Sequence, residues 1–180
     1  MAVEILFETH SISEDNERGV ATGWLPGRLS ERGRSLAREL GARRRDDGLV
    51  AVFTSDLARA VETAVIAFDG SGLPIRADPR LRECDYGDLN GAPVETLAPR
   101  SRFIATPFPA GESYRQVVER VRGFLGDLVP FDGRRIVVIG HSATRWALDH
   151  LLAGRTLEEL VDAPFDWQPG WLYRTAATSP

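Results

Sequence analysis

Two histidines stand just beyond apolar segments that have the composition of buried strands. His10 comes shortly after the apolar residues 3–7, and His141 directly follows the run 136–140. In open α/β sheets the carboxyl ends of the strands form the edge where ligands bind, so two rings about 130 residues apart can share one crevice. Ser142 opens a helical segment there, and free N–H groups at a helix start favour an anion. Either histidine alone is more typical of a strand end bonded to the backbone, but the pair predicts a two-histidine site.

Arg59 is the cation best placed to join this pair. It falls in the first turn of a helical segment opened by Thr54-Ser55-Asp56, so its guanidinium can reach back over the end of the preceding strand. The chain contains no lysine, which removes Schiff-base chemistry and a Walker-type lysine. A guanidinium fork beside two imidazoles suits a phosphoryl group. The alternative is a surface arginine paired with Glu62 or Asp56.

Glu83 lies in the polar stretch 81–87 and is the candidate general acid. A carboxyl group serves in that role when burial or a neighbouring phosphate raises its pKa. Asp85 is the competing candidate for the same role. A simple ion pair with Arg80 or Arg82 is the alternative without chemistry.

These residues need a sheet and covering helices to position them. Strands alternating with helices are typical of α/β proteins with a mostly parallel sheet covered on both faces. Residues 171–175 alternate and predict an edge strand whose direction stays open, and His150 falls inside a helix as a structural or surface residue. Apolar spacing predicts strands at 3–7, 50–53 and 135–139 and helices around 36–40, 57–68, 114–128 and 147–152.

The chain reads as a single domain, residues 1–180, because no linker or repeat divides it. Between Gly91 and Gly111 the periodic pattern gives way to a proline-rich segment. Such a segment between regular elements predicts a loop or short cap near the site.

Composition excludes several classes of partner. The net charge of −4 and the lack of a basic stripe argue against nucleic acid. No apolar run approaches the roughly 20 residues of a membrane span. The single cysteine, Cys84, cannot form an internal disulfide, and the start of the chain lacks a leader pattern, so a cytoplasmic protein is expected. A homodimer is compatible with the sequence, which does not define the oligomeric state.

Taken in order, the motifs resemble those of the histidine phosphatase superfamily, which includes cofactor-dependent phosphoglycerate mutases and small metabolite phosphatases. The likeness runs along most of the chain, and its segment 54–64 matches the second arginine motif of that family almost letter for letter. The matching positions are His10, Asn16, Gly23-Trp24-Leu25, the stretch 29–33, the stretch 54–64, the stretch 81–91, Gly111-Glu112-Ser113 and Ile139-Gly140-His141.

The resemblance implies a three-layer α/β/α sandwich and a phosphatase acting on a small phosphorylated metabolite without a metal or cofactor. It implies that His10 is the nucleophile and forms a phosphohistidine, which splits one hard displacement into two easier ones. Arg59 and His141 are then expected to neutralise the transferred group, and Glu83 to protonate the departing alkoxide. Thr9, Ser11, Asn16 and Ser142 are the expected substrate-binding residues.

The chain departs from the family in the motif around the nucleophile. The family signature is Arg-His-Gly, whereas this chain has Thr9-His10-Ser11. Losing that charged fork removes a charge-assisted hydrogen bond, on the order of 1.5–3 kcal/mol. Val20 stands where many members have a further basic residue, and Ser142 follows the second histidine in place of glycine.

Three accounts fit these departures. In the first, the chain is a working phosphatase in which Arg18, Arg28 or Arg145, or the substrate itself, supplies the missing cation. In the second, it binds a phosphorylated ligand without turnover. In the third, His10 and Glu83 perform acid–base chemistry on another ligand. The first is favoured because the nucleophile, second arginine, acid and second histidine all survive, and the short cap favours hydrolysis over mutase activity.

Overall fold

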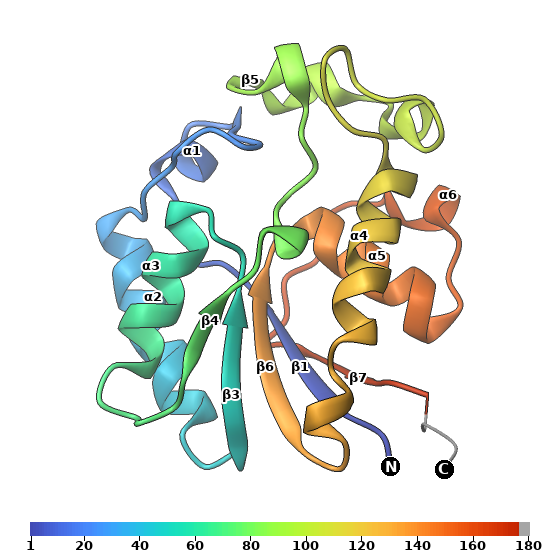
Figure 1. Cartoon of the computed structure of the whole chain (residues 1–180). Coiled ribbons are helices and arrows are strands. Elements are labelled where there is room, and N and C mark those ends of the chain that lie inside the picture. Colours follow the sequence, from blue (N-terminus) through green and yellow to red (C-terminus); the bar gives the residue numbers. More distant parts are fainter. Residues whose placement is uncertain (177–180) are drawn as a thin grey trace.

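The computed structural model describes residues 1–176, which form a five-stranded sheet with the strand order β4-β3-β6-β1-β7. The first four of these strands are parallel to their neighbours, and β7 runs antiparallel to β1 at the edge (Figure 1). The expected mostly parallel sheet is confirmed, and the direction of β7 is the point that the sequence left open. The strands are β1 (Glu4–Thr9), β3 (Leu49–Thr54), β4 (Ile75–Ala77), β6 (Arg135–Gly140) and β7 (Trp171–Arg174).

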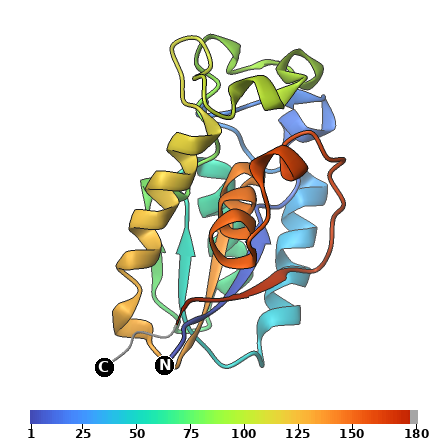
Figure 2. The ribbon, with the colours of Figure 1, turned by 90° about the vertical axis from the view of Figure 1, so that its right-hand side faces the viewer.

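Helices cover both faces of the sheet and complete the expected three-layer sandwich (Figures 1 and 2). The helices α2 (Glu31–Arg44) and α3 (Ala58–Phe68) lie on one face, and α4 (Tyr114–Gly126) and α5 (Ser142–Ala153) lie on the other. Two apolar clusters fill the spaces between these layers. The central strand β6 is apolar on both faces because both are buried, which is why its sequence reads as a continuous hydrophobic run.

Helix starts follow local capping chemistry. Ser30 accepts a hydrogen bond from Gly33 N at 3.1 Å and caps the start of α2. Ser113 and Gln116 form a reciprocal capping box that begins α4. Two shorter helices, α1 (Glu14–Glu17) and α6 (Leu157–Leu160), lie in the connections.

A cap lies beyond the carboxyl ends of the strands, at the top of Figure 1. It is built from short pieces, and one of them, β5, pairs antiparallel with β2. The segment 91–111, predicted as a loop or short cap, carries β5, η3 and η4. The pieces are β2 (Val20–Ala21), η2 (Gly87–Leu89), β5 (Ala92–Pro93), η3 (Val94–Leu97) and η4 (Arg100–Phe103), while η1 (Pro79–Leu81) and η5 (Val129–Phe131) lie lower.

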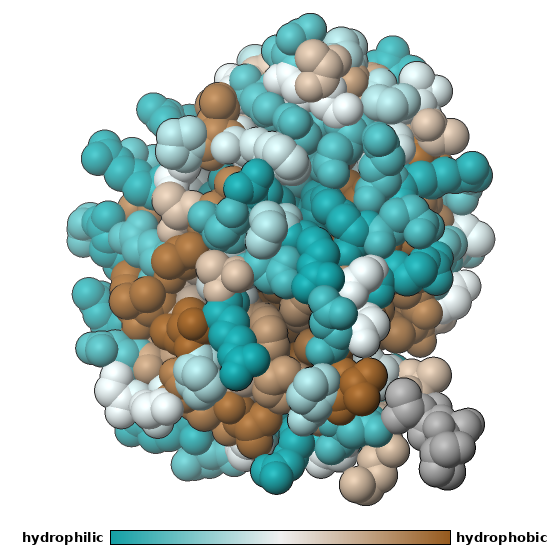
Figure 3. Space-filling view, in the orientation of Figure 1, coloured by the Kyte–Doolittle hydropathy of each residue, from teal (hydrophilic) through white to brown (hydrophobic). Residues whose placement is uncertain are grey.

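The surface is mixed in character. The face in Figure 3 is mostly hydrophilic over its upper half, with apolar residues gathered at the lower left, where α3 and β4 lie in Figure 1. Val65 of α3 and Ile75 of β4 are among the exposed large apolar residues. Among the described residues, none of the helices is both long and apolar enough to span a bilayer.

Candidate active site

The structure brings the two strand-end histidines together. His10 follows β1 and His141 follows β6, and these neighbouring strands are parallel. The His10 backbone N–H donates to Gly140 O at 2.9 Å, which aligns the two strand ends. The ring centroids lie 5.0 Å apart at an interplanar angle of 53°. The parallel pairing of β1 and β6 therefore places two histidines that are distant in the sequence in one site.

The tautomer of His10 leaves one ring nitrogen free for nucleophilic attack. Nδ1 lies 2.7 Å from Ser11 O, and because a carbonyl oxygen only accepts, Nδ1 carries the proton. Burial, with a smaller effect from the Arg59 charge, lowers the pKa of His10 to about 3. The ring is therefore neutral at physiological pH, and its Nε2 lone pair is available.

Arg59 brings a fixed positive charge to both rings. It is the second residue of α3, in the first turn of that helix, and is only 2% exposed. Its Nη2 donates to Gly23 O at 2.8 Å and lies 3.4 Å from His141 Nδ1. The alternative of a surface arginine paired with Glu62 or Asp56 is wrong, because Arg59 is buried. Glu62 pairs with Arg34, and Asp56 pairs with Arg82.

Glu83 has the environment of a general acid. It is 8% exposed, and burial raises the pKa of its carboxyl group, while backbone hydrogen bonds and Arg59 oppose that rise. Both backbone donors, Cys84 N at 2.8 Å and Ala143 N at 3.2 Å, bond to Oε1. Because both donors bond to Oε1, a proton on this carboxyl group is expected at Oε2. Asp85, the competing candidate, accepts from Gly87 N and from the Asn90 side chain within a turn of the cap.

Ser55 belongs to the site, although sequence reasoning gave it no role. Its Oγ lies 2.6 Å from His141 Nε2, and the side chain is fully buried. Burial and Arg59 hold the pKa of His141 well below its usual value, so the ring is neutral. With Arg59 donating toward Nδ1, the remaining Nε2–H donates to Ser55. The motif Thr54-Ser55-Asp56 was the available signal, because it sits at the same sheet edge as the histidines.

The expected substrate-binding residues occupy different environments. The Ser11 hydroxyl donates to Gly33 O at 2.6 Å, and the Asn16 side chain accepts from Ser13 N in the capping box of α1. Both polar groups thus serve local structure here. Ser142 is the half-buried first residue of α5, and Thr9 ends β1 opposite Gly140. Substrate binding by these four residues stays a prediction.

The arginines that could replace the missing signature cation have other partners in this structure. Arg18 and Arg28 form ion pairs with carboxylates of α1. Arg145 stacks over aromatic rings of the C-terminal segment, 5.0 Å from the nearer centroid. Arg59 is the arginine whose charge acts on the pKa of His10. The site therefore combines a free imidazole nitrogen, one guanidinium, a second imidazole and a buried carboxyl group whose pKa is raised. Within the described part of the chain, no group of three or more acidic, histidine or cysteine side chains is arranged to hold a metal ion.

Comparisons with known proteins identify the family of the chain. The family model described as histidine phosphatase superfamily (branch 1) matches residues 5–169. A 2,3-bisphosphoglycerate-dependent phosphoglycerate mutase from a Methylobacterium species is 33% identical over 173 residues, covering 87% of this chain and 83% of that relative. A putative phosphoserine phosphatase from Hydrogenobacter thermophilus is 30% identical over 170 residues, covering 87% of this chain and 82% of that relative.

Solved structures show the same fold. A mycobacterial glucosyl-3-phosphoglycerate phosphatase in complex with VO3 superposes with a TM-score of 0.72 and 30% sequence identity. That match covers 84% of this chain and 80% of the other. The sequence relatives and this structure together include both mutases and phosphatases.

Proposed function

Because the chain belongs to the histidine phosphatase superfamily, we propose that it is a phosphomonoesterase that hydrolyses a small phosphorylated metabolite through a phosphohistidine at His10. The observation that carries the proposal is the neutral His10 ring, whose Nε2 is free beside His141 and under the charge of Arg59. The relatives that are named phosphatases support hydrolysis as the reaction class.

In the first step, His10 Nε2 attacks phosphorus and the bond from phosphorus to the leaving oxygen breaks. The proton held on Glu83 Oε2 passes to that oxygen, so the product leaves as an alcohol. Arg59 faces the equatorial oxygens. The negative charge of the phosphoryl group raises the pKa of His141 against the effect of burial, which makes the second ring a better donor. Fixed donors of this kind supply most of the catalysis in phosphoryl transfer.

In the second step, water attacks the phosphohistidine. The Glu83 carboxylate left by the first step accepts a proton from this water, and the bond from His10 Nε2 to phosphorus breaks. Inorganic phosphate departs, and both residues return to their starting states. One carboxyl group thus acts first as acid and then as base.

Thr9 motivates a second candidate function, the binding of a phosphorylated ligand without turnover. A threonine hydroxyl offers one neutral donor where the family signature offers a guanidinium, so one fixed charge is missing next to the nucleophile. Affinity for a phosphate group can survive the loss of this charge, since Arg59 and the start of α5 remain. Stabilisation of the transition state falls, which lowers turnover.

A panel of phosphate monoesters tests the proposal. We expect the wild-type chain to release inorganic phosphate from at least one ester and to form an acid-labile phosphoenzyme, and His10→Ala to abolish both. The matched control is His150→Ala, because His150 bonds to Arg155 O at the far end of α5 and should keep full activity.

The same panel separates the alternatives. Absence of turnover combined with a raised melting temperature in the presence of a phosphorylated metabolite would support the binding function instead. Transfer of the phosphoryl group to an added acceptor, with little free phosphate, would indicate a mutase. Conversion of a ligand without phosphate release would indicate acid–base chemistry by His10 and Glu83.

A further inference from the structure

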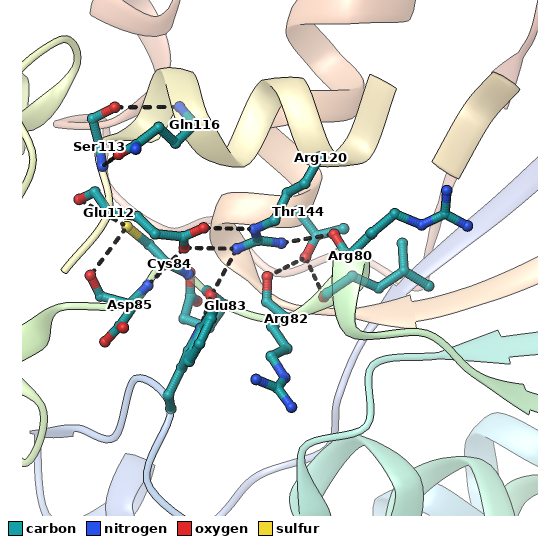
Figure 4. Close-up of polar contacts among 12 residues, drawn as sticks. Arg80, Arg82, Glu83, Cys84, Asp85, Glu112, Ser113, Gln116, Arg120 and Thr144 are labelled. Carbon is teal, nitrogen blue, oxygen red and sulfur yellow. Dashed lines mark hydrogen bonds and ion pairs between the residues drawn. The ribbon is translucent and has the colours of Figure 1, made fainter. Parts of the chain in front are cut away.

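Arg120 of α4 lies at the centre of a polar cluster next to Glu83 (Figure 4). Its Nη1 donates to Arg80 O at 2.7 Å and its Nη2 to Glu83 O at 2.9 Å. Its Nε and Nη2 also bind the Glu112 carboxylate, at 2.9 and 3.1 Å. The side chain is 15% exposed. One planar guanidinium therefore connects α4 to three points of the chain that surround the proposed acid.

The contact with Glu83 is to the main chain, which places Arg120 behind the reacting group. The same Glu83 carbonyl accepts a second hydrogen bond from Trp24 Nε1 at 2.7 Å. At the other end of the residue, backbone N–H groups of Cys84 and Ala143 hold the carboxyl group. Glu83 is thus fixed at both its backbone and its side chain, as a general acid must be to meet a leaving oxygen.

The Glu112 contact joins the base of the cap to the same cluster. Asp85 N donates to Glu112 Oε2 at 3.0 Å, and Glu112 N donates to Asp85 O at 2.9 Å. The chain enters the cap just after Glu83 and leaves it at Glu112. Arg120 of α4 therefore contacts both strands of the chain at the base of the cap, through the Glu83 carbonyl and the Glu112 carboxylate. A shift of Glu112 would move the backbone that carries the acid.

We propose that Arg120 is a positioning residue for the general acid Glu83, an inference that rests on the proposed phosphatase function. It holds the Glu83 backbone through its carbonyl and through Glu112, so that Oε2 points at the departing oxygen. Arg120 acts on protonation of the leaving group, while nucleophilic attack by His10 depends on other contacts. Its loss should therefore matter most for esters whose leaving group needs a proton.

The test compares two classes of substrate. We expect Arg120→Met to lower kcat/KM for an alkyl phosphate, a poor leaving group, by about 100-fold, within the range attributed to general acid catalysis. For 2,4-dinitrophenyl phosphate, whose leaving group departs without a proton, we expect kcat/KM to change by less than about 3-fold, since kcat/KM reports only the first step and the acid contributes little there. Arg120→Lys keeps the charge and a donor, so it should recover part of the alkyl phosphate activity.

Non-additivity with Glu83 gives a second readout. In the Glu83→Gln background, which has no acidic proton to deliver, adding Arg120→Met should lower kcat no further, because the two residues act as one unit. The double variant Arg120→Met/Glu112→Gln removes the unpaired carboxylate left by the single change and guards against unfolding. Arg135→Met is the matched control, since Arg135 also binds a carboxylate and a backbone carbonyl, but at the opposite end of the sheet.

The possible results are distinct. Equal losses for both ester classes, or additive losses with Glu83→Gln, would overturn the positioning role and leave the phosphatase function intact. A folded wild-type chain with no turnover on either ester would remove the function and this inference together. A selective loss for the alkyl ester, with partial rescue by lysine and no selectivity in Arg135→Met, is the expected outcome.

Discussion

At the scale of single residues, burial acts on His10 and Glu83 in a common way with different chemical results. It favours the neutral form of each group, which lowers the pKa of the imidazole and raises that of the carboxyl group. A neutral imidazole has a free lone pair, and a neutral carboxyl group has a proton to donate. One dry environment thus prepares a nucleophile and an acid at the same pH.

The raised pKa of Glu83 predicts how activity depends on pH. Below that pKa the carboxyl group is protonated and the first step is fast, so kcat/KM should fall as pH rises through it. Glu83→Gln should lower kcat for an alkyl phosphate by about 10²- to 10⁴-fold and remove this alkaline limb. A pH–rate profile from pH 4 to 9 measures both. An unchanged alkaline limb in the variant would assign that limb to another group.

The same shift predicts the pH dependence of stability. The folded pKa of Glu83 lies above the unfolded value of about 4.5, so its contribution to stability is complete below pH 4.5 and is lost as pH rises through the folded pKa. Glu83→Gln should therefore raise the melting temperature relative to wild type at pH 8 more than at pH 4. Thermal unfolding at the two pH values measures the difference, and parallel curves would contradict it.

Thr9 can be tested by restoring the family residue. Thr9→Arg should raise turnover of an aryl phosphate by roughly 10- to 100-fold, the equivalent of one charge-assisted hydrogen bond. Thr9→Met is the control, because it lengthens the side chain without adding charge. If the arginine variant is less active on every ester tested, Thr9 is a specialised substrate contact.

At the scale of elements, the first turn of α2 supports the loop that follows His10. A Cβ at Gly33 would lie 1.9 Å from Ile12 O, and the Gly33 carbonyl accepts the Ser11 hydroxyl. The helix therefore approaches this loop at backbone contact distance, which only glycine permits. The geometry of the nucleophile depends on that approach.

Substitution of this glycine should affect both stability and activity. Gly33→Ala should destabilise the chain by about 1–3 kcal/mol, as expected for overpacking, and should lower kcat by displacing the loop after His10. Gly126→Ala is the control, since that position ends α4 with no neighbour within 4 Å. It should be neutral or stabilising by up to about 1 kcal/mol. Urea unfolding and phosphate release measure the two effects, and equal behaviour of the two variants would refute the role of α2.

At the scale of the whole molecule, a buried ion-pair network joins distant segments. Glu8 of β1 is 1% exposed and accepts from Arg44 Nε at 2.8 Å and Arg43 Nη2 at 3.2 Å, both on α2. Arg44 also donates to Pro169 O in the segment that leads to β7. The network therefore attaches the edge strand to the helical layer.

Breaking this network should be costly. Arg44→Met should destabilise the chain by about 3 kcal/mol, near the lower end for a buried pair, because Arg43 still faces Glu8. Arg122→Met, which breaks an exposed pair with Glu119, should change stability by less than about 1 kcal/mol. Chemical denaturation of both variants is the measurement, and similar values would show that the Glu8 network contributes little.

The sequence alone determined the strands β1, β3 and β6, the four long helices that cover the sheet and the positions of the two histidines at strand ends. These features follow from burial, because a strand buried on both faces must be apolar along its length, and the residue after it stands at the sheet edge. Arg59 was also recognisable, since its motif lies just after such a strand. A local sequence pattern is therefore sufficient to predict an element when each face of that element lies in a single environment, buried or exposed.

Tertiary structure decided which strands and side chains lie next to one another. The three residues of the short strand β4 are exposed, so the sequence there has no apolar pattern that predicts a strand. The direction of β7 depends on its pairing with β1. Ser55 meets His141 across 86 residues of chain, and Arg120 meets the Glu83 carbonyl across 37. A hydrogen bond between such groups forms only when several packed elements bring the donor and the acceptor together. The residue types alone show which groups can donate or accept, but not where the fold places them.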